Sequence, residues 1–312
     1  MPLNILLAAP PESWDAYEAP LKTALKAAGL RACLATEMAP DRVDYIIYAP
    51  NGPLSDFTPF SRAQAVLSLW AGVEKIVDNP TLTQPLTRMV DEGLSVGMAE
   101  WVTGHVLRHH LDIDRDILRA PGDWTPHIPP LARERPVSIL GLGALGQAAA
   151  RMLAGIGFPV TGWSRTRKDI AIAGLTCLSG AAGLQEALER AEILVLLLPD
   201  TPATRDILDA RRLAMLPCGA VVLNPGRGAL IDDDALLAAL DAGQVGHATL
   251  DVFRHEPLPA GHPYWTHPKV TVTPHIAAET RPATAARVIA ENIRRSEAGE
   301  PLLYQVERRR GY

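Results

Sequence analysis

Three residues with side chains suited to carbonyl chemistry, Arg227, Glu256 and His275, each stand just after a predicted strand. An arginine can hold a carboxylate and polarise a carbonyl group. A histidine can deliver a proton to the carbonyl oxygen as a hydride reaches the carbon, and a carboxylate beside it favours the imidazolium form. Because ligands of a parallel sheet bind at the carboxyl ends of its strands, we expect the three side chains to form one hydride-transfer site.

Each of these residues also has a simpler interpretation when it is taken alone. His275 fits a core or surface histidine, Arg227 between two glycines fits a solvated loop charge, and Glu256 before Pro257 fits a turn residue. The catalytic interpretation therefore depends on the three occurring together after successive strands.

A glycine-rich segment upstream would position a cofactor for that chemistry. Residues 137–146 read Val-Ser-Ile-Leu-Gly-Leu-Gly-Ala-Leu-Gly and lead into an Ala-rich helix, which is the G-x-G-x-x-G fingerprint in a strand–turn–helix context. Gly141 permits the turn, Gly143 lets the backbone approach a pyrophosphate, and Gly146 allows close helix–strand packing. The free amides at the helix start would hold the phosphates, so we predict a dinucleotide site.

The residues after the next predicted strand indicate which dinucleotide binds. A carboxylate usually ends this strand and binds the adenine ribose, but here Ser164 is followed by Arg165, Arg167 and Lys168. A hydroxyl and a basic cluster suit a 2′-phosphate, which arginine can bind through two parallel N–H groups. We therefore expect NADP(H), with NAD(H) less favoured; the alternative is a solvated charged turn.

Strand and helix patterns alternate along most of the chain, which predicts an α/β protein with two doubly wound parallel-sheet domains. The second domain has six predicted strands, at 137–140, 159–163, 193–198, 220–224, 247–251 and 270–273. The N-terminal part has αβ units but no fingerprint of its own, and a helix over 98–120 leads out of it. The last helix, 281–298, is expected to return to the first domain. The predicted domains are 1–98 with 280–312 (substrate domain) and 99–279 (NADP-binding domain).

Composition excludes several classes of partner. The 312 residues carry a formal net charge of −5, which disfavours a nucleic-acid or anionic-membrane partner, and no apolar run has the length of a membrane helix. The three cysteines are widely spaced and odd in number, so we expect neither a disulfide framework nor a metal cluster, and a cytoplasmic location. His105, His109 and His110 lack acidic or cysteine partners, and we interpret them as structural and expect no metal.

Taken together, the motifs resemble the D-2-hydroxyacid dehydrogenase family, and within it they are most similar to the glyoxylate/hydroxypyruvate reductases. The matching segments are 71–73, 141–146, 163–168, 223–228, 250–258, 273–278 and 306–312. The resemblance implies a Rossmann-type nucleotide domain inserted in a flavodoxin-like substrate domain. It also implies NADPH-dependent reduction of small 2-oxoacids, glyoxylate and hydroxypyruvate, to glycolate and D-glycerate.

The resemblance further implies roles for individual residues. Arg227 would bind the carboxylate and carbonyl of the 2-oxoacid, His275 would be the general acid, and Glu256 would orient and charge His275. Asp251 would hold the nicotinamide carboxamide. The backbone amides of Ala71, Gly72 and Val73 would grip the substrate carboxylate. Further cofactor contacts are expected from Ala144, Leu145, Leu198, Pro199, Thr204, Asn224, Pro225, Gly226 and His275.

Two tryptophans and the expected assembly leave alternatives open. Trp70 beside the substrate would shorten the pocket and favour small substrates, or it is simply packed in the core. A homodimer is implied, in which Trp124 either reaches the active site of the partner subunit or is an exposed loop aromatic. The alternatives for function are a dehydrogenase for a bulkier 2-ketoacid and a catalytically silent dinucleotide-sensing protein.

Overall fold

The computed structural model describes residues 2–311, so Met1 and Tyr312, the first residue of the predicted substrate domain and the last residue of the 306–312 motif, lie outside it. The chain forms two units. Unit 1 comprises Met1–Leu94 and Glu279–Tyr312, and unit 2 comprises Ser95–Ala278. Helix α2 (Glu92–His110) carries the chain across the boundary between them.

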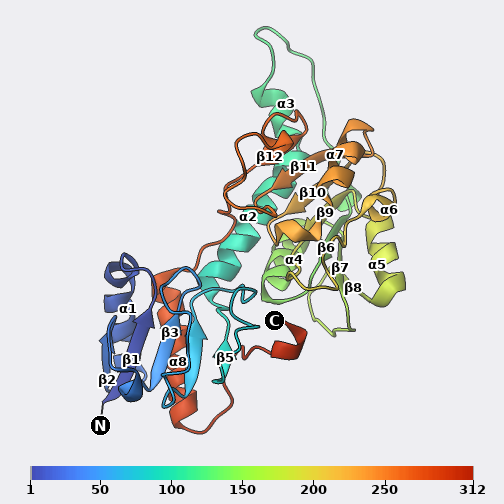
Figure 1. Cartoon of the computed structure of the whole chain (residues 1–312). Helices are drawn as coiled ribbons and strands as arrows, with labels where there is room; N and C mark the ends of the chain where they lie inside the picture. Colours follow the sequence, from blue (N-terminus) through green and yellow to red (C-terminus); the bar gives the residue numbers. More distant parts are fainter. Residues whose placement is uncertain (1, 312) are drawn as a thin grey trace. The chain divides into compact units, whose positions relative to one another are not determined.

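Unit 1 is built on a five-stranded parallel sheet in the order β2-β1-β3-β4-β5 (Figure 1). Its strands are β1 (Leu3–Ala8), β2 (Ala32–Ala35), β3 (Tyr45–Tyr48), β4 (Ala65–Ser68) and β5 (Leu86–Thr87). The order 2-1-3-4-5 is that of flavodoxin-like folds.

The strands of unit 1 are apolar on both sides, so alternate residues contribute to two separate cores. Ile5 and Leu7 pack in one core with α1 (Ser13–Ala27) and α8 (Pro282–Glu297), so the C-terminal helix returns to this sheet. Leu6 lies in the other core, which the irregular segments 49–64 and 69–82, before and after β4, cover with apolar side chains. The short 3-10 turns of this unit are η1 (Pro40–Arg42) and η5 (Arg308–Arg310).

Unit 2 contains a seven-stranded parallel sheet in the order β12-β11-β10-β9-β6-β7-β8. Its strands are β6 (Val137–Leu140), β7 (Val160–Ser164), β8 (Leu175–Ser179), β9 (Ile193–Leu196), β10 (Ala220–Asn224), β11 (Val245–Leu250) and β12 (Val270–Val272). Counted from β6, the order is 3-2-1-4-5-6 with one further strand, which is the Rossmann arrangement. The sequence predicts six strands, and the seventh is β8, an edge strand of mixed polarity.

Helices cover both faces of the sheet in unit 2. On one face, α5 (Gly180–Glu189), α6 (Ala210–Leu213) and α7 (Asp233–Asp241) bury apolar side chains. On the other face, α4 (Ala144–Ile156) and α2 pack against β6, β7 and β9. Three 3-10 turns complete the unit, namely η2 (Ala132–Glu134), η3 (Gly228–Leu230) and η4 (Pro263–Trp265).

Two predicted helices differ from the structure. The helix predicted over 98–120 begins earlier, where the Asp91 carboxylate accepts hydrogen bonds from the amides of Gly93 and Leu94, as an N-cap does. It ends at His110, because Asp112 adopts a left-handed conformation (φ 54°) before the short α3 (Ile113–Ile117). The helix predicted over 204–216 is reduced to α6, capped by Asp209.

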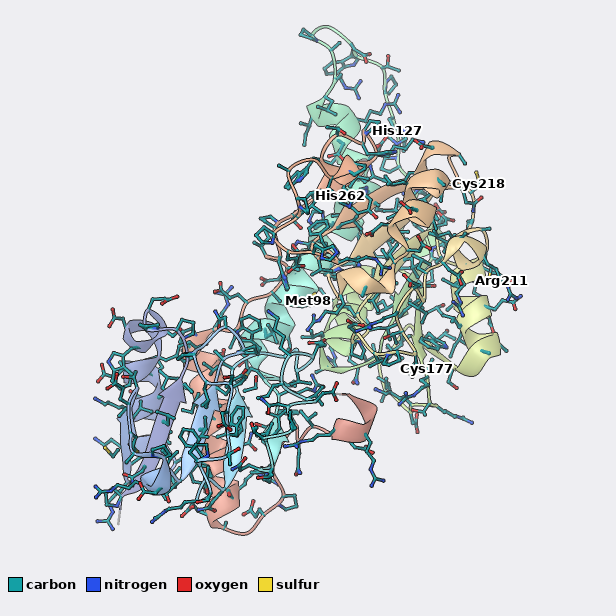
Figure 2. All side chains as sticks on the ribbon, in the orientation of Figure 1. Met98, His127, Cys177, Arg211, Cys218 and His262 are labelled. Atoms are coloured by element: carbon teal, nitrogen blue, oxygen red, sulfur yellow. The ribbon has the colours of Figure 1, made fainter. Side chains whose placement is uncertain are left out.

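The three cysteines lie in different parts of the two units. Cys177 on β8 and Cys218 before β10 lie apart in unit 2 (Figure 2), Cys33 belongs to unit 1, and all three are free thiols. Within residues 2–311, no helix has both the length and the apolar composition of a membrane span.

Candidate active site

The three predicted catalytic residues lie in the loops that follow β10, β11 and β12 of unit 2. The Nδ1 atom of His275 lies 2.8 Å from Oε2 of Glu256. Both side chains are accessible, with 52% of the His275 and 35% of the Glu256 side chain exposed. The other oxygen of Glu256 accepts a hydrogen bond of 2.9 Å from the amide of Phe253, so the carboxylate is oriented by its own loop.

The backbone of His275 is held in a left-handed conformation, with φ of 54°. Asp251 holds this turn: its Oδ1 accepts from the Thr273 hydroxyl at 2.6 Å and the Ile276 amide at 2.9 Å, and its Oδ2 from the Ala277 amide at 2.9 Å. The carbonyl oxygen of Asp251 accepts from the His275 amide at 2.9 Å. Asp251 is fully buried, so it fixes the loop on which His275 stands.

Arg227 lies in a turn organised by Asn224, the last residue of β10. The side-chain amide of Asn224 donates to the Arg227 carbonyl at 2.9 Å, and its oxygen accepts from the Gly226 amide at 3.1 Å. The Arg227 guanidinium donates to the Gly226 carbonyl at 2.7 Å. Asn224, Pro225 and Gly226 are buried, whereas Arg227 remains partly accessible, so the turn presents a cation at the sheet edge.

The fingerprint glycines have the backbone and space that the motif requires. Gly141 has φ of 112°, and a Cβ there would overlap the carbonyl of Leu197. A Cβ at Gly146 would overlap the carbonyl of Gly141. Gly143 faces open space and precedes α4, whose start has no side-chain cap. The first amides of α4, including those of Ala144 and Leu145, are therefore oriented toward an accessible site suited to an anion.

The basic segment after β7 lies beside this glycine loop. The ammonium group of Lys168 donates to the carbonyl of Leu142 at 2.8 Å. The hydroxyl of the buried Ser164 donates to the Thr166 carbonyl at 2.8 Å, and Arg165 and Arg167 are exposed. The segment places cationic side chains next to the fingerprint, where the adenine end of a dinucleotide lies in this fold.

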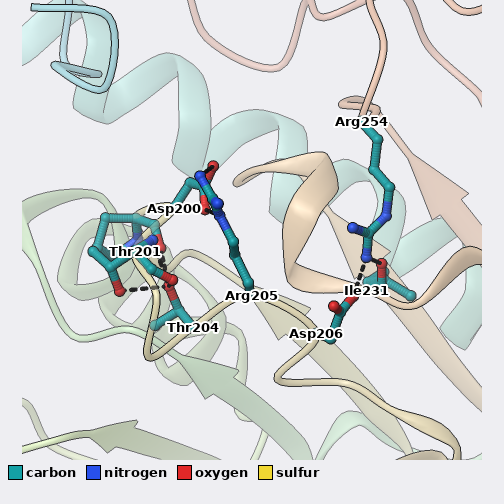
Figure 3. Close-up of polar contacts among 8 residues, drawn as sticks. Asp200, Thr201, Thr204, Arg205, Asp206, Ile231 and Arg254 are labelled. Carbon is teal, nitrogen blue, oxygen red and sulfur yellow. Dashed lines mark hydrogen bonds and ion pairs between the residues drawn. The ribbon is translucent and has the colours of Figure 1, made fainter.

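The loop after β9 is closed by threonines (Figure 3). The Thr204 hydroxyl donates to the Pro199 carbonyl at 2.6 Å and accepts from the Thr201 amide at 2.9 Å. The partly exposed Leu198 and Pro199 stand at the start of this loop. The loop therefore has a fixed conformation at the same edge of the sheet.

In unit 1, the segment from Trp70 to Val73 follows β4. Trp70 is 38% exposed, with the Lys75 ammonium 6.0 Å from its ring centroid, so the alternative of core packing for Trp70 is wrong. Its amide donates to the Ser68 hydroxyl at 3.1 Å. Among residues 2–311, no protein acceptor is bonded to the amides of Ala71, Gly72 or Val73. Successive free amides of this kind suit a carboxylate.

The histidines of α2 have structural surroundings. His109 Nε2 lies 2.9 Å from the Thr249 hydroxyl, His110 packs edge-on against Phe158, and His105 packs against Trp101. No group of three or more potential metal ligands occurs in the part of the chain from residue 2 to 311.

Two residues that support the site, Thr273 and Arg254, were not predicted from the sequence. The Thr273 hydroxyl donates to Asp251. Because Thr273 stands in the 273–278 motif, two residues before His275, its position in the sequence could have indicated this role. Arg254 was also missed, because its partners lie 23 and 48 residues away in the chain.

Comparisons with known proteins identify the family of the chain. Residues 103–277 match the family model of the D-isomer specific 2-hydroxyacid dehydrogenase, NAD binding domain. The chain is 41% identical over 257 residues to glyoxylate/hydroxypyruvate reductase A of Yersinia enterocolitica, covering 80% of this chain and 82% of that protein.

Solved structures resemble the whole chain. A D-isomer specific 2-hydroxyacid dehydrogenase from Xanthobacter autotrophicus, in complex with NADPH and MES, is 42% identical with a TM-score of 0.90, covering 100% of both chains. The NADPH-dependent glyoxylate/hydroxypyruvate reductase of Sinorhizobium meliloti, in complex with NADP and sulfate, is 36% identical with a TM-score of 0.82, covering 100% of this chain and 99% of that one. The protein therefore belongs to the D-isomer specific 2-hydroxyacid dehydrogenase family.

Proposed function

We propose that the protein is an NADPH-dependent reductase of small 2-oxoacids, which converts glyoxylate to glycolate and hydroxypyruvate to D-glycerate. The observation that carries this proposal is the His275–Glu256 pair, 2.8 Å apart, in loops at the carboxyl edge of a Rossmann sheet. The similarity to the glyoxylate/hydroxypyruvate reductases of Yersinia enterocolitica and Sinorhizobium meliloti supports the substrate class.

The residues at the adenine and pyrophosphate ends suit a 2′-phosphorylated dinucleotide. Helix α4 starts without a side-chain cap, and Gly143 leaves open space at this end, which suits the pyrophosphate. The 2′-phosphate would bind to the basic segment after β7, formed by Ser164, Arg165, Arg167 and Lys168. The remaining contacts are proposed for Leu198, Pro199, Thr204, Asn224, Pro225, Gly226 and Asp251. When bound, NADPH supplies the hydride that adds to C2 of the 2-oxoacid.

His275 supplies the proton in this proposal. Its Nδ1 faces Glu256, which leaves Nε2 to donate to the carbonyl oxygen as that oxygen gains charge. The Glu256 carboxylate orients the ring through its contact with Nδ1. In the oxidative direction His275 would accept the proton from the 2-hydroxy acid.

Two groups hold the substrate in this proposal. The Arg227 guanidinium binds the carboxylate and polarises the carbonyl, while the free amides of Ala71, Gly72 and Val73 bind the carboxylate. The exposed indole of Trp70 limits the length of the substrate, which favours glyoxylate and hydroxypyruvate over larger 2-ketoacids.

We propose that the protein works as a homodimer in the cytoplasm. The chain from α3 to η2 exposes five large apolar side chains, and the loop after α3 projects from unit 2 (Figure 1). These residues, which we call the arm, are Ile117 (71% exposed), Leu118 (81%), Trp124 (94%), Ile128 (89%) and Leu131 (53%). A second copy of the chain would cover them. The three free thiols suit a reducing compartment.

The proposed dimer is tested by measuring the molecular mass of the protein by light scattering after size-exclusion chromatography. We expect the wild type to have the mass of two chains and Leu118→Glu to shift it toward one chain. A wild type of single-chain mass would refute the dimer.

A substrate panel tests the function. Steady-state rates with glyoxylate, hydroxypyruvate, pyruvate and phenylpyruvate are measured with NADPH and with NADH. We expect the highest kcat/KM for glyoxylate or hydroxypyruvate with NADPH. Preference for phenylpyruvate would overturn the substrate assignment, and no turnover of any 2-oxoacid would overturn the enzymatic function.

A further inference from the structure

The side chain of Arg254 connects three loops at the carboxyl edge of the sheet in unit 2 (Figure 3). Its Nη2 donates to the carboxylate of Asp206, in the loop after β9, and to the carbonyl of Ile231, which follows the turn that begins at Arg227. Its Nε lies 3.4 Å from Oδ2 of Asp233 at the start of α7. Arg254 itself stands in the loop that carries Glu256.

We infer that Arg254 is a positioning residue for the reduction. It holds the Glu256 loop against the Arg227 loop, so that the Glu256 carboxylate stays within hydrogen-bond distance of His275 Nδ1. The inference rests on the proposed function, because it assigns Arg254 a role in the same reaction.

A continuous set of contacts leads from Arg254 to His275. The residue before it, Phe253, donates its amide to Oε1 of Glu256 at 2.9 Å. The second oxygen of Glu256 then lies 2.8 Å from His275 Nδ1. A displacement of the backbone at 253–254 would therefore move the carboxylate away from the histidine.

The Arg227 loop meets the same backbone segment. A Cβ added at Gly228 would overlap the backbone of Phe253 and Arg254. Only a glycine permits this approach, so the loops carrying Arg227 and Glu256 are in direct backbone contact. The Arg254 side chain adds a second contact between these loops through the carbonyl of Ile231.

The acceptors of Arg254 are themselves fixed. Asp206 has φ of 50°, and its amide donates to the carbonyl of Ala229 at 2.9 Å. The other oxygen of Asp233 accepts from the hydroxyl of the buried Tyr264 at 2.9 Å. Arg254 therefore bonds to groups that cannot follow it if its loop moves.

Neighbouring arginine–aspartate pairs lack this property. Arg205 bonds to Asp200, five residues away in the same loop, and Arg212 to Asp209, three residues away. The Arg212 pair matches the Arg254 pair in exposure, with 36% and 40% of the side chains exposed against 32% and 49%. It connects no second loop, so Arg212→Ala is a matched control.

The experiment compares Arg254→Ala with Arg212→Ala in the full-length protein, with NADPH and glyoxylate. For Arg254→Ala we expect kcat to fall about tenfold to a hundredfold, as small misplacements of catalytic groups do. Arg212→Ala should keep the wild-type kcat.

A double-mutant cycle with Glu256→Gln separates positioning from general loss of structure. If Arg254 acts through Glu256, adding Arg254→Ala to Glu256→Gln lowers kcat by less than twofold further, because the two losses are not additive. Arg254→Lys, which keeps the charge but lacks the planar set of donors, should recover part of the rate. Asp206→Asn should reproduce part of the fall in kcat. This variant replaces Arg254→Ala in the test if Arg254→Ala does not fold.

Two results would overturn the inference. One is a wild-type kcat in folded Arg254 variants. The other is full additivity with Glu256→Gln. A wild-type protein without turnover would refute the proposed function instead, so the two failures are distinguishable.

Discussion

The backbone of His275 is bonded to that of Asp251, 24 positions earlier in the chain, and the Asp251 side chain holds the residues on either side of His275. The His275 amide donates to the Asp251 carbonyl at 2.9 Å, and the Asp251 carboxylate accepts from the two residues that follow His275. A non-glycine residue with positive φ costs free energy and persists only where its surroundings fix it. Asp251 provides that constraint at the proposed acid.

Asp251→Asn is expected to loosen this turn. One amide oxygen can replace Oδ1, but the amide nitrogen would face the N–H of Ala277, so a buried donor loses its acceptor. We expect the free energy of unfolding to fall by about 1–3 kcal/mol, measured by urea denaturation, together with a lower kcat. Thr273→Val removes only the hydroxyl bond and should cost about 1 kcal/mol. Unchanged stability of Asp251→Asn would show that the carboxylate does not hold the turn.

His275→Ala is expected to remove the proton donor and leave the cofactor site intact. We predict a fall in kcat of about 10²–10⁴-fold, with NADPH affinity, followed by nucleotide fluorescence, close to that of the wild type. His267→Gln is the matched control, since His267 Nε2 also faces a carboxylate, Asp241 at 3.3 Å, away from the candidate site. Equal losses in the two variants would remove His275 from the mechanism.

Glu256→Gln tests the carboxylate separately from the histidine. Glutamine can still accept the amide bond from Phe253, but it lacks the negative charge that faces Nδ1 of His275. We expect kcat for reduction to fall about tenfold, because a charge-assisted contact is replaced by a neutral one. A wild-type kcat in Glu256→Gln would mean that the carboxylate does not act through His275.

Local rules of sequence explain which parts of this site could be predicted. The fingerprint identified β6 and α4 because Gly141 and Gly146 meet steric demands that act within a few residues. The strand-end positions of Arg227 and His275 followed from alternation of strands and helices. Strand β8 was missed because an edge strand needs no continuous apolar run. The helix break was missed because a single aspartate within a helical pattern is a weaker signal for a turn than glycine or proline.

Contacts between distant parts of the chain could not be predicted in this way. The bonds of Arg254 to Asp206 and Ile231 depend on loops from three different strands meeting at one edge. The hydrogen bonds from the 273–277 turn to Asp251 depend on the register of β11 against β12, in which Leu250 pairs with Val272. Such support follows from the assembled sheet and not from any local pattern.

Replacing the basic segment after β7 should change cofactor choice. In the double variant Ser164→Asp with Arg165→Ala, a carboxylate stands where the 2′-phosphate is proposed to lie and one cation is lost. We expect kcat/KM for NADPH to fall by about 10²-fold, since a charge-assisted contact is exchanged for a repulsion, while that for NADH is retained or rises. Arg190→Ala, which removes an arginine paired with Glu186 on α5, should change neither. An unchanged NADPH preference would locate the 2′-phosphate elsewhere.

Two histidines on unit 2 should make the protein sensitive to acid. The rings of His109 and His247 lie 4.8 Å apart. Burial, with the neighbouring His247, lowers the pKa of His109 from 6.5 to about 3, and burial, with the charge of Arg108, lowers the pKa of His247 to about 4. The unfolded chain therefore binds more protons than the folded protein below pH 6.5, and the free energy of unfolding decreases as pH falls from 6.5 toward 3.

His109→Gln removes one of these titrating groups, while its amide can still bond to the Thr249 hydroxyl that His109 contacts at 2.9 Å. We expect the free energy of unfolding of this variant, measured by urea denaturation between pH 4 and 7.5, to decline less steeply with acid than that of the wild type. The exposed His255, changed to Gln, should leave the slope unchanged. If the wild type and His109→Gln lose stability in parallel across this range, the acid sensitivity arises from other groups, because only a histidine kept neutral by the fold contributes the slope predicted here.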